Sequence, residues 1–232
     1  MSNAFADIYD ILCGYLSVER QAAFEKVLDA RTRHLCAVVE DIYMDRNAGA
    51  IMRTCDGLGV QDVHVVENYN LLKVSDSISQ GAQKWLSTNY YSDSVECARA
   101  LKAKGYRVAA TTPHRDARNI ENIALNTPLA VFMGGEKEGL SEALLAEADE
   151  FITLPNVGFS ESFNVSVAAA LILSRLRERL NAMGQAHGLR EVEKIRLRIE
   201  WALKSIREGE KVLARHIGKE RLNELKAFLR AD

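Results

Sequence analysis

Residues 155–171 read PNVGFSESFNVSVAAAL, a polar cluster that runs directly into small apolar residues. The apolar residues predict a helix that begins near residue 162 and is buried on all sides. Polar side chains at a helix start can satisfy backbone N–H groups that lack a partner within the helix. Capping explains only one of these side chains, so we expect the others to face a ligand. The polar side chains are Ser160, Ser162, Asn164 and Ser166.

Composition limits the classes of protein to consider. The chain has 232 residues, of which 47% are hydrophobic and 27% charged, as in one soluble globular domain with an appendage or at most two domains. No stretch approaches the roughly 18 apolar residues of a membrane span, and the first ten residues lack the features of a signal peptide. The four cysteines form no CxxC pair and the five histidines have no metal-binding spacing. We therefore expect a cytoplasmic protein with no membrane segment and no metal.

Strand-like and helix-like segments alternate along the middle of the chain. Strand patterns occupy residues 34–42, 60–68, 107–112, 129–134 and 150–155, and helical patterns occupy 47–59, 95–105 and 141–148. This order predicts an α/β fold in which helices cover both faces of a mostly parallel sheet. Ligands of such sheets bind at the carboxyl ends of the strands. Residues 4–32 and 189–230 are predicted to form helices that precede and follow the sheet.

Charge is divided unevenly along the chain. Residues 1–174 hold 15 Lys and Arg against 23 Asp and Glu, whereas residues 175–232 hold 15 against 9. A basic appendage on an acidic body suits a polyanion-binding arm. A solvated helix with ion pairs between residues three or four apart would account for the same charges.

Two further loops follow predicted strands. In NAGAIMRTCD, residues 47–56, Asn47 is expected to cap a helix, and Arg53 points away from the apolar side of that helix. An ordinary surface arginine would occupy the same place. In FMGGEKEGLS, residues 132–141, Gly134 and Gly135 let backbone N–H groups approach a ligand, and Glu136 is either a helix-start carboxylate or a site residue.

Two classes of enzyme are disfavoured by missing motifs. The chain has no G-x-G-x-x-G fingerprint, which argues against a nucleotide-dependent oxidoreductase. The GFSES stretch lacks the second glycine of a nucleophile elbow and no histidine follows at a suitable place, which argues against a Ser-His hydrolase.

Taken together, the three loops resemble a known family. NAGAIMRTCDGLGV, FMGGEKEGLS and LPNVGFSESFNVSVAAAL are similar, in this order, to motifs 1, 2 and 3 of the SpoU 2′-O-ribose RNA methyltransferases of the SPOUT superfamily. The resemblance covers roughly residues 34–180. The RTCD form and the short helical ends resemble the TrmH branch, which methylates the D-loop guanosine at position 18 of tRNA. The sequence departs from the family pattern at Arg46 and Ala48, which often are His and Leu, and at Phe163, which often is Leu.

The resemblance implies an architecture beyond what the residue pattern predicts. Its carboxyl-terminal part would be threaded into a trefoil knot, a rare exception to normal connectivity. It further implies a homodimer with the catalytic site at the subunit interface and S-adenosylmethionine bound in the knot. The expected domains are an N-terminal helical extension (1–33), a methyltransferase domain (34–180) and a basic C-terminal helical extension (181–232).

The resemblance also implies roles for particular residues. Arg53 would be the catalytic residue, acting either as a proton acceptor or as a fixed cation that stabilises the developing alkoxide. Its partners would be Asn47, Glu136, Ser162 and Asn164. The cofactor would contact the backbone around Thr111, Gly134, Gly135, Leu154, Phe163 and Val165. The candidates for contacts to the tRNA backbone are Arg190, Lys194 and Arg198 in the tail and Arg20, Arg31 and Arg33 near the start.

Two other functions remain compatible with the sequence. A ribosomal RNA could be the substrate of the same reaction, although residues 1–33 are too short for the extra N-terminal domain usual in such relatives. A catalytically inactive RNA-binding protein would keep the fold, but the presence of Arg53 and Asn164 argues against it.

Overall fold

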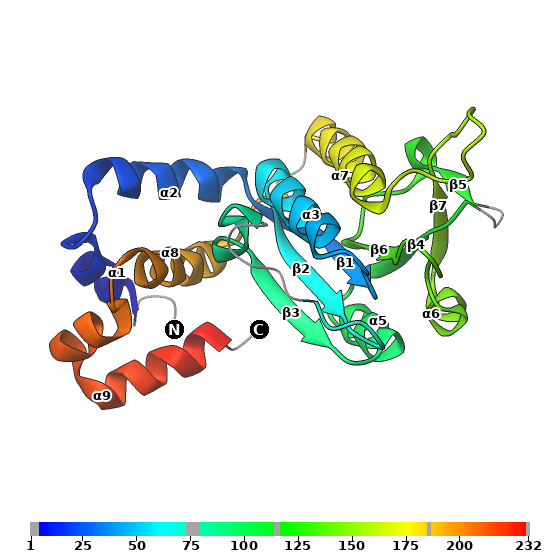
Figure 1. Cartoon of the computed structure of the whole chain (residues 1–232). Helices are drawn as coiled ribbons and strands as arrows, with labels where there is room; N and C mark the ends of the chain where they lie inside the picture. Colours follow the sequence, from blue (N-terminus) through cyan, green and yellow to red (C-terminus); the bar gives the residue numbers. More distant parts are fainter. Residues whose placement is uncertain (1–4, 73–78, 114–116, 185–186, 231–232) are drawn as a thin grey trace. The chain divides into compact units, whose positions relative to one another are not determined.

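Figure 1 shows a computed structural model of the chain, which describes residues 5–72, 79–113, 117–184 and 187–230. The chain divides into two compact units. Thr32–His187 form one, and Met1–Arg31 together with Gly188–Asp232 form the other. The predicted N- and C-terminal extensions thus pack together as a single helical unit.

The sheet unit holds, in chain order, β1 (Thr32–Glu40), α3 (Asp45–Leu58), β2 (Val60–Val66), β3 (Ser87–Tyr91), α5 (Ser94–Ala103), β4 (Arg107–Thr111), β5 (Arg118–Asn119), β6 (Leu129–Gly134), α6 (Glu142–Glu147), β7 (Glu150–Thr153) and α7 (Val165–Ala182), with short 3-10 helices η2 (Ala82–Lys84) and η3 (Ile120–Asn122). The seven strands are ordered β3-β2-β1-β6-β4-β7-β5, and each neighbouring pair is parallel. The predicted α/β fold is confirmed, and the trefoil knot stays a prediction.

Helices cover both faces of this sheet, with α3 and α7 on one face and α5 and α6 on the other (Figure 1). The alternation of side chains along β1 explains the two layers, because successive residues of a strand point to opposite faces. Leu35, Ala37 and Val39 join the cluster that contains α3 and α7. Cys36 and Val38 join the cluster under α5 and α6. Both faces are buried, as expected for a parallel sheet.

The two edge strands were not predicted from the sequence. β3 has the sequence STNYY and no fully buried residue, and β5 has only two residues, Arg and Asn, both exposed. Neither segment contains the apolar run or strict alternation that marks a strand. Their pairing depends on the neighbouring strands β2 and β7, which the tertiary structure supplies.

The helical unit contains α1 (Ala6–Cys13), α2 (Val18–Ala30), α8 (Glu191–Ser205) and α9 (Gly209–Arg230), the last with a kink at Gly218. Trp201 is buried at its centre, with the Phe24 ring edge-on to it and the Arg31 guanidinium carbon 5.5 Å from its ring centroid. No described helix is long and apolar enough to cross a membrane.

Candidate active site

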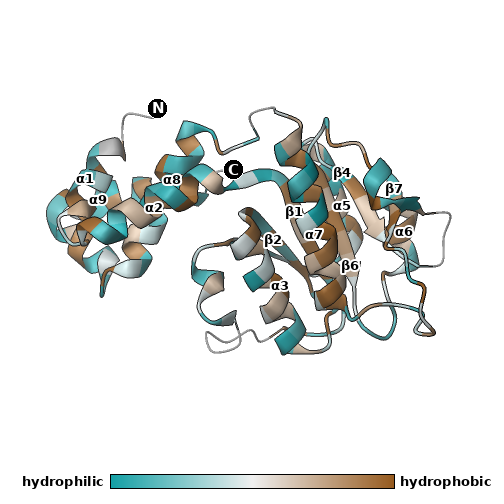
Figure 2. Cartoon of the chain, turned by 90° about the horizontal axis from the view of Figure 1, so that it is seen from above, coloured by the Kyte–Doolittle hydropathy of each residue, from teal (hydrophilic) through white to brown (hydrophobic). Residues whose placement is uncertain are grey.

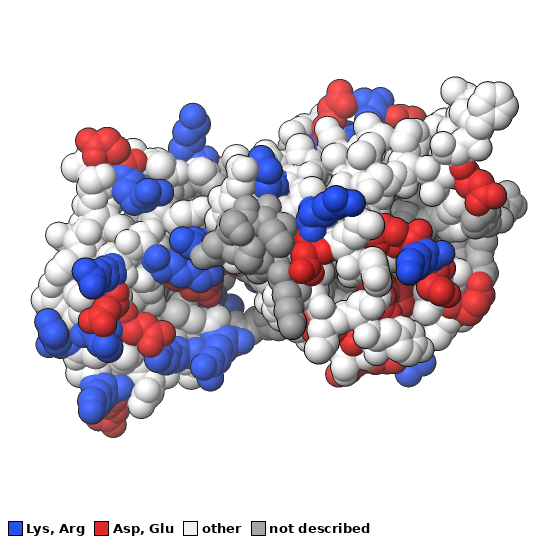
Figure 3. All heavy atoms as spheres, in the orientation of Figure 1, with Lys and Arg blue, Asp and Glu red and all other residues white. Residues whose placement is uncertain are grey.

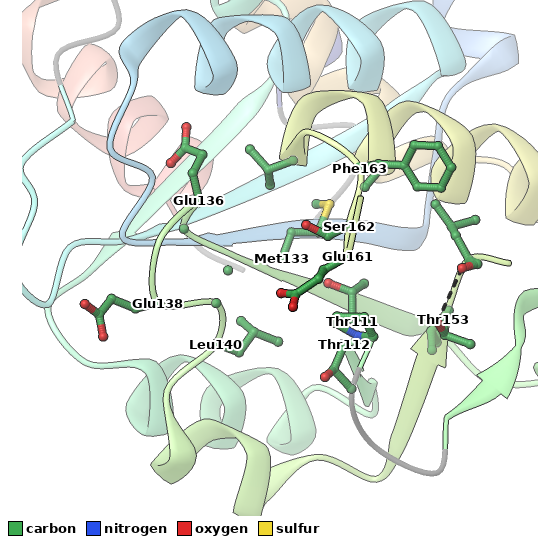
Figure 4. A pocket seen from close by; sticks show the side chains of 18 of the residues that line it. Thr111, Thr112, Met133, Glu136, Glu138, Leu140, Thr153, Glu161, Ser162 and Phe163 are labelled. Atoms are coloured by element: carbon green, nitrogen blue, oxygen red, sulfur yellow. Dashed lines mark hydrogen bonds between the residues drawn. The ribbon is translucent and has the colours of Figure 1, made fainter. Parts of the chain in front are cut away.

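A pocket of about 560 Å³ lies at the carboxyl ends of β4, β6 and β7. This is the edge of a parallel sheet at which ligands bind, and the volume lies within the range of small-molecule sites. Figure 4 shows Glu136 and Glu138 on one side of the pocket and Thr111, Thr112 and Thr153 on the other. The loop after β6 and the loop before α7 complete its wall.

The loop after β6 requires glycine because its backbone is closely packed. A Cβ atom on Gly134 would lie 2.1 Å from the carbonyl carbon of Gly139, and one on Gly135 would lie 2.4 Å from the carbonyl oxygen of Asp41. The Gly139 N–H donates to the Gly135 carbonyl over 3.0 Å and closes the loop on itself. These contacts hold the loop against the end of β1 and fix the position of Glu136.

In the polar cluster before α7, one residue caps the helix and another lines the pocket. Asn164 is the N-cap residue, and its Oδ1 accepts hydrogen bonds from the backbone N–H groups of Ser166 (2.9 Å) and Val167 (3.4 Å). The helix therefore begins at Val165 and not near Ser162 as predicted. Ser162 is left free of the helix and lines the pocket (Figure 4).

The prediction that α7 is buried on all sides is wrong. Its first turns are apolar, as Figure 2 shows, but Val167 is 46% exposed and Leu171 is 45% exposed. Ala169, Ile172 and Leu173 of the same helix are buried in the core of the sheet unit. Within one chain, only one side of this apolar helix is covered.

Three predicted site residues from three different loops form a hydrogen-bonded chain. The Asn164 side-chain amide donates to Asn47 Oδ1 over 3.4 Å, and the Asn47 amide in turn donates to Glu136 Oε1. The prediction that Asn47 caps a helix is wrong, because α3 begins at Asp45 and its N-cap residue is Met44. Asn47 instead lies buried in the first turn, where its side chain joins the two other loops.

Glu136 is held as a carboxylate by these contacts. Burial alone raises its pKa, but the hydrogen bonds from the Asn47 side chain and from the Tyr43 backbone outweigh burial and place the pKa below the usual glutamate value. The Tyr43 N–H donates to Glu136 Oε2 over 3.0 Å. A fixed, ionised carboxylate therefore stands at the pocket wall.

Arg53 lies on the exposed side of α3, as predicted. It does not line the pocket, and no hydrogen bond or ion pair joins its side chain to another residue in the described part of the chain. Its guanidinium is thus available to a substrate or to a second protein chain, and its catalytic role stays a prediction.

The six residues predicted to surround the cofactor all line the one pocket. They are Thr111, Gly134, Gly135, Leu154, Phe163 and Val165. Several pocket residues were not predicted from the sequence, among them the charged residues Lys137, Glu138, Glu142 and Glu161. Figure 4 shows the Glu161 carboxylate directed into the pocket between the loops. The sequence signal for Glu161 was its position inside the polar cluster before α7, where a charged side chain would be unusual in a purely structural helix cap.

The basic residues predicted to contact RNA have intrachain partners. Arg190 pairs with Glu193, Lys194 with Asp29, and Arg198 with both Glu25 and Glu191. Figure 3 shows Lys and Arg interspersed with Asp and Glu on the drawn face of the helical unit.

The three candidates near the chain start differ in exposure. Arg20 is exposed on α2, Arg31 is buried beside Trp201, and Arg33 on β1 pairs with Asp62. A contact of any of the six to RNA stays a prediction.

Comparison with known proteins assigns this arrangement to a family. The model described as the SpoU rRNA Methylase family matches residues 34–174, and the chain belongs to this family. The matched segment contains the three loops that supply Asn47, Glu136 and Asn164.

Individual proteins of known name show which members of this family the chain resembles. The tRNA (guanosine(18)-2′-O)-methyltransferase of Borreliella burgdorferi is 36% identical over 191 residues, which cover 82% of this chain and 88% of that protein. The protein of the same name from Thermus thermophilus is 39% identical over 164 residues, covering 70% and 84%. The crystal structure of the Aquifex aeolicus TrmH/SpoU tRNA modifying enzyme matches with a TM-score of 0.74 and 26% identity, covering 82% of this chain and 98% of that one.

Proposed function

We propose that this protein is an S-adenosylmethionine-dependent methyltransferase that modifies the ribose 2′ oxygen of the D-loop guanosine at position 18 of tRNA. The observation that carries the proposal is the hydrogen-bonded chain Asn164–Asn47–Glu136 beside a pocket of suitable size. Membership of the SpoU family and the names of the similar proteins support the reaction and the substrate.

The pocket suits the proposed cofactor in size and in charge. Its lining combines apolar side chains, among them Leu140 and Ile152, with backbone at the strand ends. Four carboxylates and one lysine line it, which favours a cation over an anion. They are Glu136, Glu138, Glu142, Glu161 and Lys137. S-adenosylmethionine fits this balance, because its sulfonium and ammonium groups together outnumber its carboxylate.

When bound, S-adenosylmethionine supplies a methyl group on a sulfonium for transfer to the ribose oxygen. We assign the protein three tasks in this reaction. Asn164 and Asn47 order the loops around the ribose, and Glu136 fixes Asn47. Arg53 either accepts the proton or stabilises the alkoxide as a fixed cation, and the permanent positive charge of arginine side chains in proteins favours the second role.

We also infer that the active form is a homodimer with shared sites. Val167 and Leu171 lie four residues apart on one side of α7, and a paired apolar surface of this kind is typical of an interface. Since Arg53 does not line the pocket of its own chain, we expect a second copy to supply it.

Subunit mixing tests the shared site. Arg53→Ala and Asn164→Ala proteins, each expected to be slower than the wild type when assayed alone, are unfolded and refolded together. If each site takes Arg53 from one chain and Asn164 from the other, half of the dimers are hybrid and contain one intact site, so the intact sites add about a quarter of the wild-type rate to the residual rates of the variants. A mixture that forms hybrid dimers but is no faster than the two variants alone would contradict the shared site.

Methyl transfer to defined transcripts tests the proposed reaction. The full chain is incubated with labelled S-adenosylmethionine and a tRNA that carries guanosine or 2′-deoxyguanosine at position 18. We expect labelling of the first tRNA only, since the second lacks the acceptor oxygen. Equal labelling of both would refute the position, transfer to ribosomal RNA alone would refute the substrate, and binding of tRNA without transfer would indicate an inactive RNA-binding protein.

A further inference from the structure

The loop between β1 and α3 places an aromatic ring next to the candidate active site. The Tyr43 backbone N–H donates to Glu136 Oε2 over 3.0 Å, and Glu136 also accepts from Asn47. The Tyr43 backbone is thereby tied to the same carboxylate that connects the site loops. Lys137, the residue after Glu136, lies next to the Tyr43 ring.

The Tyr43 ring is exposed, and the positively charged side chain of Lys137 lies next to it. Its side chain lies beyond the core, with the residue 59% exposed, and the Lys137 Nζ atom is 4.5 Å from the ring centroid. Lys137 also lines the pocket. An exposed aromatic ring beside a positive charge is the combination with which proteins stack unpaired bases and attract the adjoining phosphate.

The loop is held rigidly, which suits a platform. The Asp41 carboxylate accepts hydrogen bonds from the backbone N–H groups of Tyr69 (2.9 Å) and Asn70 (3.1 Å) in the loop after β2. The Asp41 carbonyl packs against Gly135, where a Cβ atom would approach it to 2.4 Å. The loops after β1, β2 and β6 are thus joined through Asp41, two residues before Tyr43. Tyr69 adds a second exposed ring to the loops at this edge of the sheet.

We propose that Tyr43 and Lys137 form a stacking platform for an unpaired nucleobase of the substrate RNA. The base is that of the modified nucleotide or its immediate neighbour, because the platform adjoins the carboxylate that orders the ribose site. This inference rests on the proposed function, since it requires an RNA substrate. The carboxylates of the pocket disfavour a phosphate inside it, whereas the exposed Tyr43 ring offers a flat face on which a base can stack.

The experiment separates stacking from other roles by using three variants. Tyr43→Phe keeps the ring, Tyr43→Ala removes it, and Tyr90→Ala removes a ring of matched exposure (60%) on β3, away from the pocket. Affinity is measured with tRNA transcripts that carry the fluorescent base 2-aminopurine at or beside position 18. Stacking on an aromatic ring quenches this fluorophore.

We expect Tyr43→Ala to weaken tRNA binding about tenfold and to abolish the quenching, in line with typical base stacking on aromatic residues. Tyr43→Phe and Tyr90→Ala should bind and quench as the wild type does. The affinity for S-adenosylmethionine, measured by calorimetry, should be unchanged in all three variants. Lys137→Gln should weaken binding less than Tyr43→Ala and preserve the quenching.

Two outcomes would overturn the platform. Tyr43→Ala protein that binds and quenches like the wild type would show that no base stacks there. Tyr43→Ala protein that loses its association with a second copy would show that the ring serves a protein interface instead. Wild-type protein that binds and quenches the labelled tRNA but transfers no methyl group would contradict the proposed reaction alone, and leave the platform supported.

Discussion

Replacement of Asn164 separates a structural task from a functional one. Its Oδ1 caps α7 through two backbone N–H groups, while its amide donates to Asn47. In Asn164→Ala the lost cap costs about 1 kcal/mol of stability, which lowers the melting temperature by roughly 2–4 °C in a chain of this size. The side-chain Oδ1 of Asn47 also loses its hydrogen-bond donor, and an unsatisfied buried acceptor costs about 1–3 kcal/mol. If this free energy is lost from the transition state, methyl transfer becomes about 5- to 150-fold slower.

Two further variants distinguish these effects. Asn164→Asp retains an oxygen that caps α7 but cannot donate to Asn47, so it should melt close to the wild type and still lose methyl transfer. Asp93→Ala removes the matched cap of α5, where Oδ1 accepts from the Glu96 N–H over 2.7 Å outside the pocket. It should lose a similar stability and keep its activity.

The assays are thermal unfolding followed by circular dichroism and initial rates of methyl transfer at saturating tRNA and cofactor. If Asn164→Asp keeps the wild-type rate, the contact from residue 164 to Asn47 has no role in methyl transfer. If Asp93→Ala loses as much activity as Asn164→Ala, the loss follows from lowered stability alone and a functional role of Asn164 is refuted.

Three other variants test the remaining assignments. Arg53→Ala should fold and bind cofactor but lose methyl transfer, whereas normal turnover would remove Arg53 from the mechanism. Glu136 has a lowered pKa, so its contribution to stability is complete above the ordinary glutamate value of about 4.3 and is lost as the pH falls through the folded pKa. Urea unfolding across this range should therefore show a smaller acid-side loss of stability in Glu136→Gln. Reversal of charge at Arg190, Lys194 and Arg198 should weaken tRNA binding and flatten its salt dependence, and an unchanged slope in a folded protein would exclude this part of the tail from the RNA contact.

The sequence could predict that the loops lie at one edge of the sheet, because they follow strands of one parallel sheet, whereas the roles of individual residues were implied only by the family resemblance and stay predictions. The carboxyl ends of these strands lie at one edge, so polar residues that follow different strands are brought together. The connection through Asn47 could not be predicted. Whether Asn47 capped α3 or lay inside its first turn depended on a shift of three residues in the N-cap position, from Asn47 to Met44, which local residue spacing does not determine.

The basic tail shows a different limit of sequence reasoning. Charge counts located half of the basic residues in the last quarter of the chain, but they could not show which of them face solvent. Lys194 and Arg198 pair with Asp29 and Glu25 on α2, residues more than 160 positions earlier. Such pairing depends on how the two ends of the chain pack into one unit, which local spacing does not contain.

The exposed side of α7 shows that an apolar helix pattern can be recognised correctly although the same chain buries only part of the helix. An apolar surface around the whole helix does predict burial. The sheet covers Ala169, Ile172 and Leu173, but Val167 and Leu171 remain 46% and 45% exposed. The sequence therefore encodes two apolar surfaces on one helix, and the fold of one chain buries only the first. Since Asn164 caps the start of the same helix, pairing of its second surface with another copy would place the partner next to the site and couple assembly to activity.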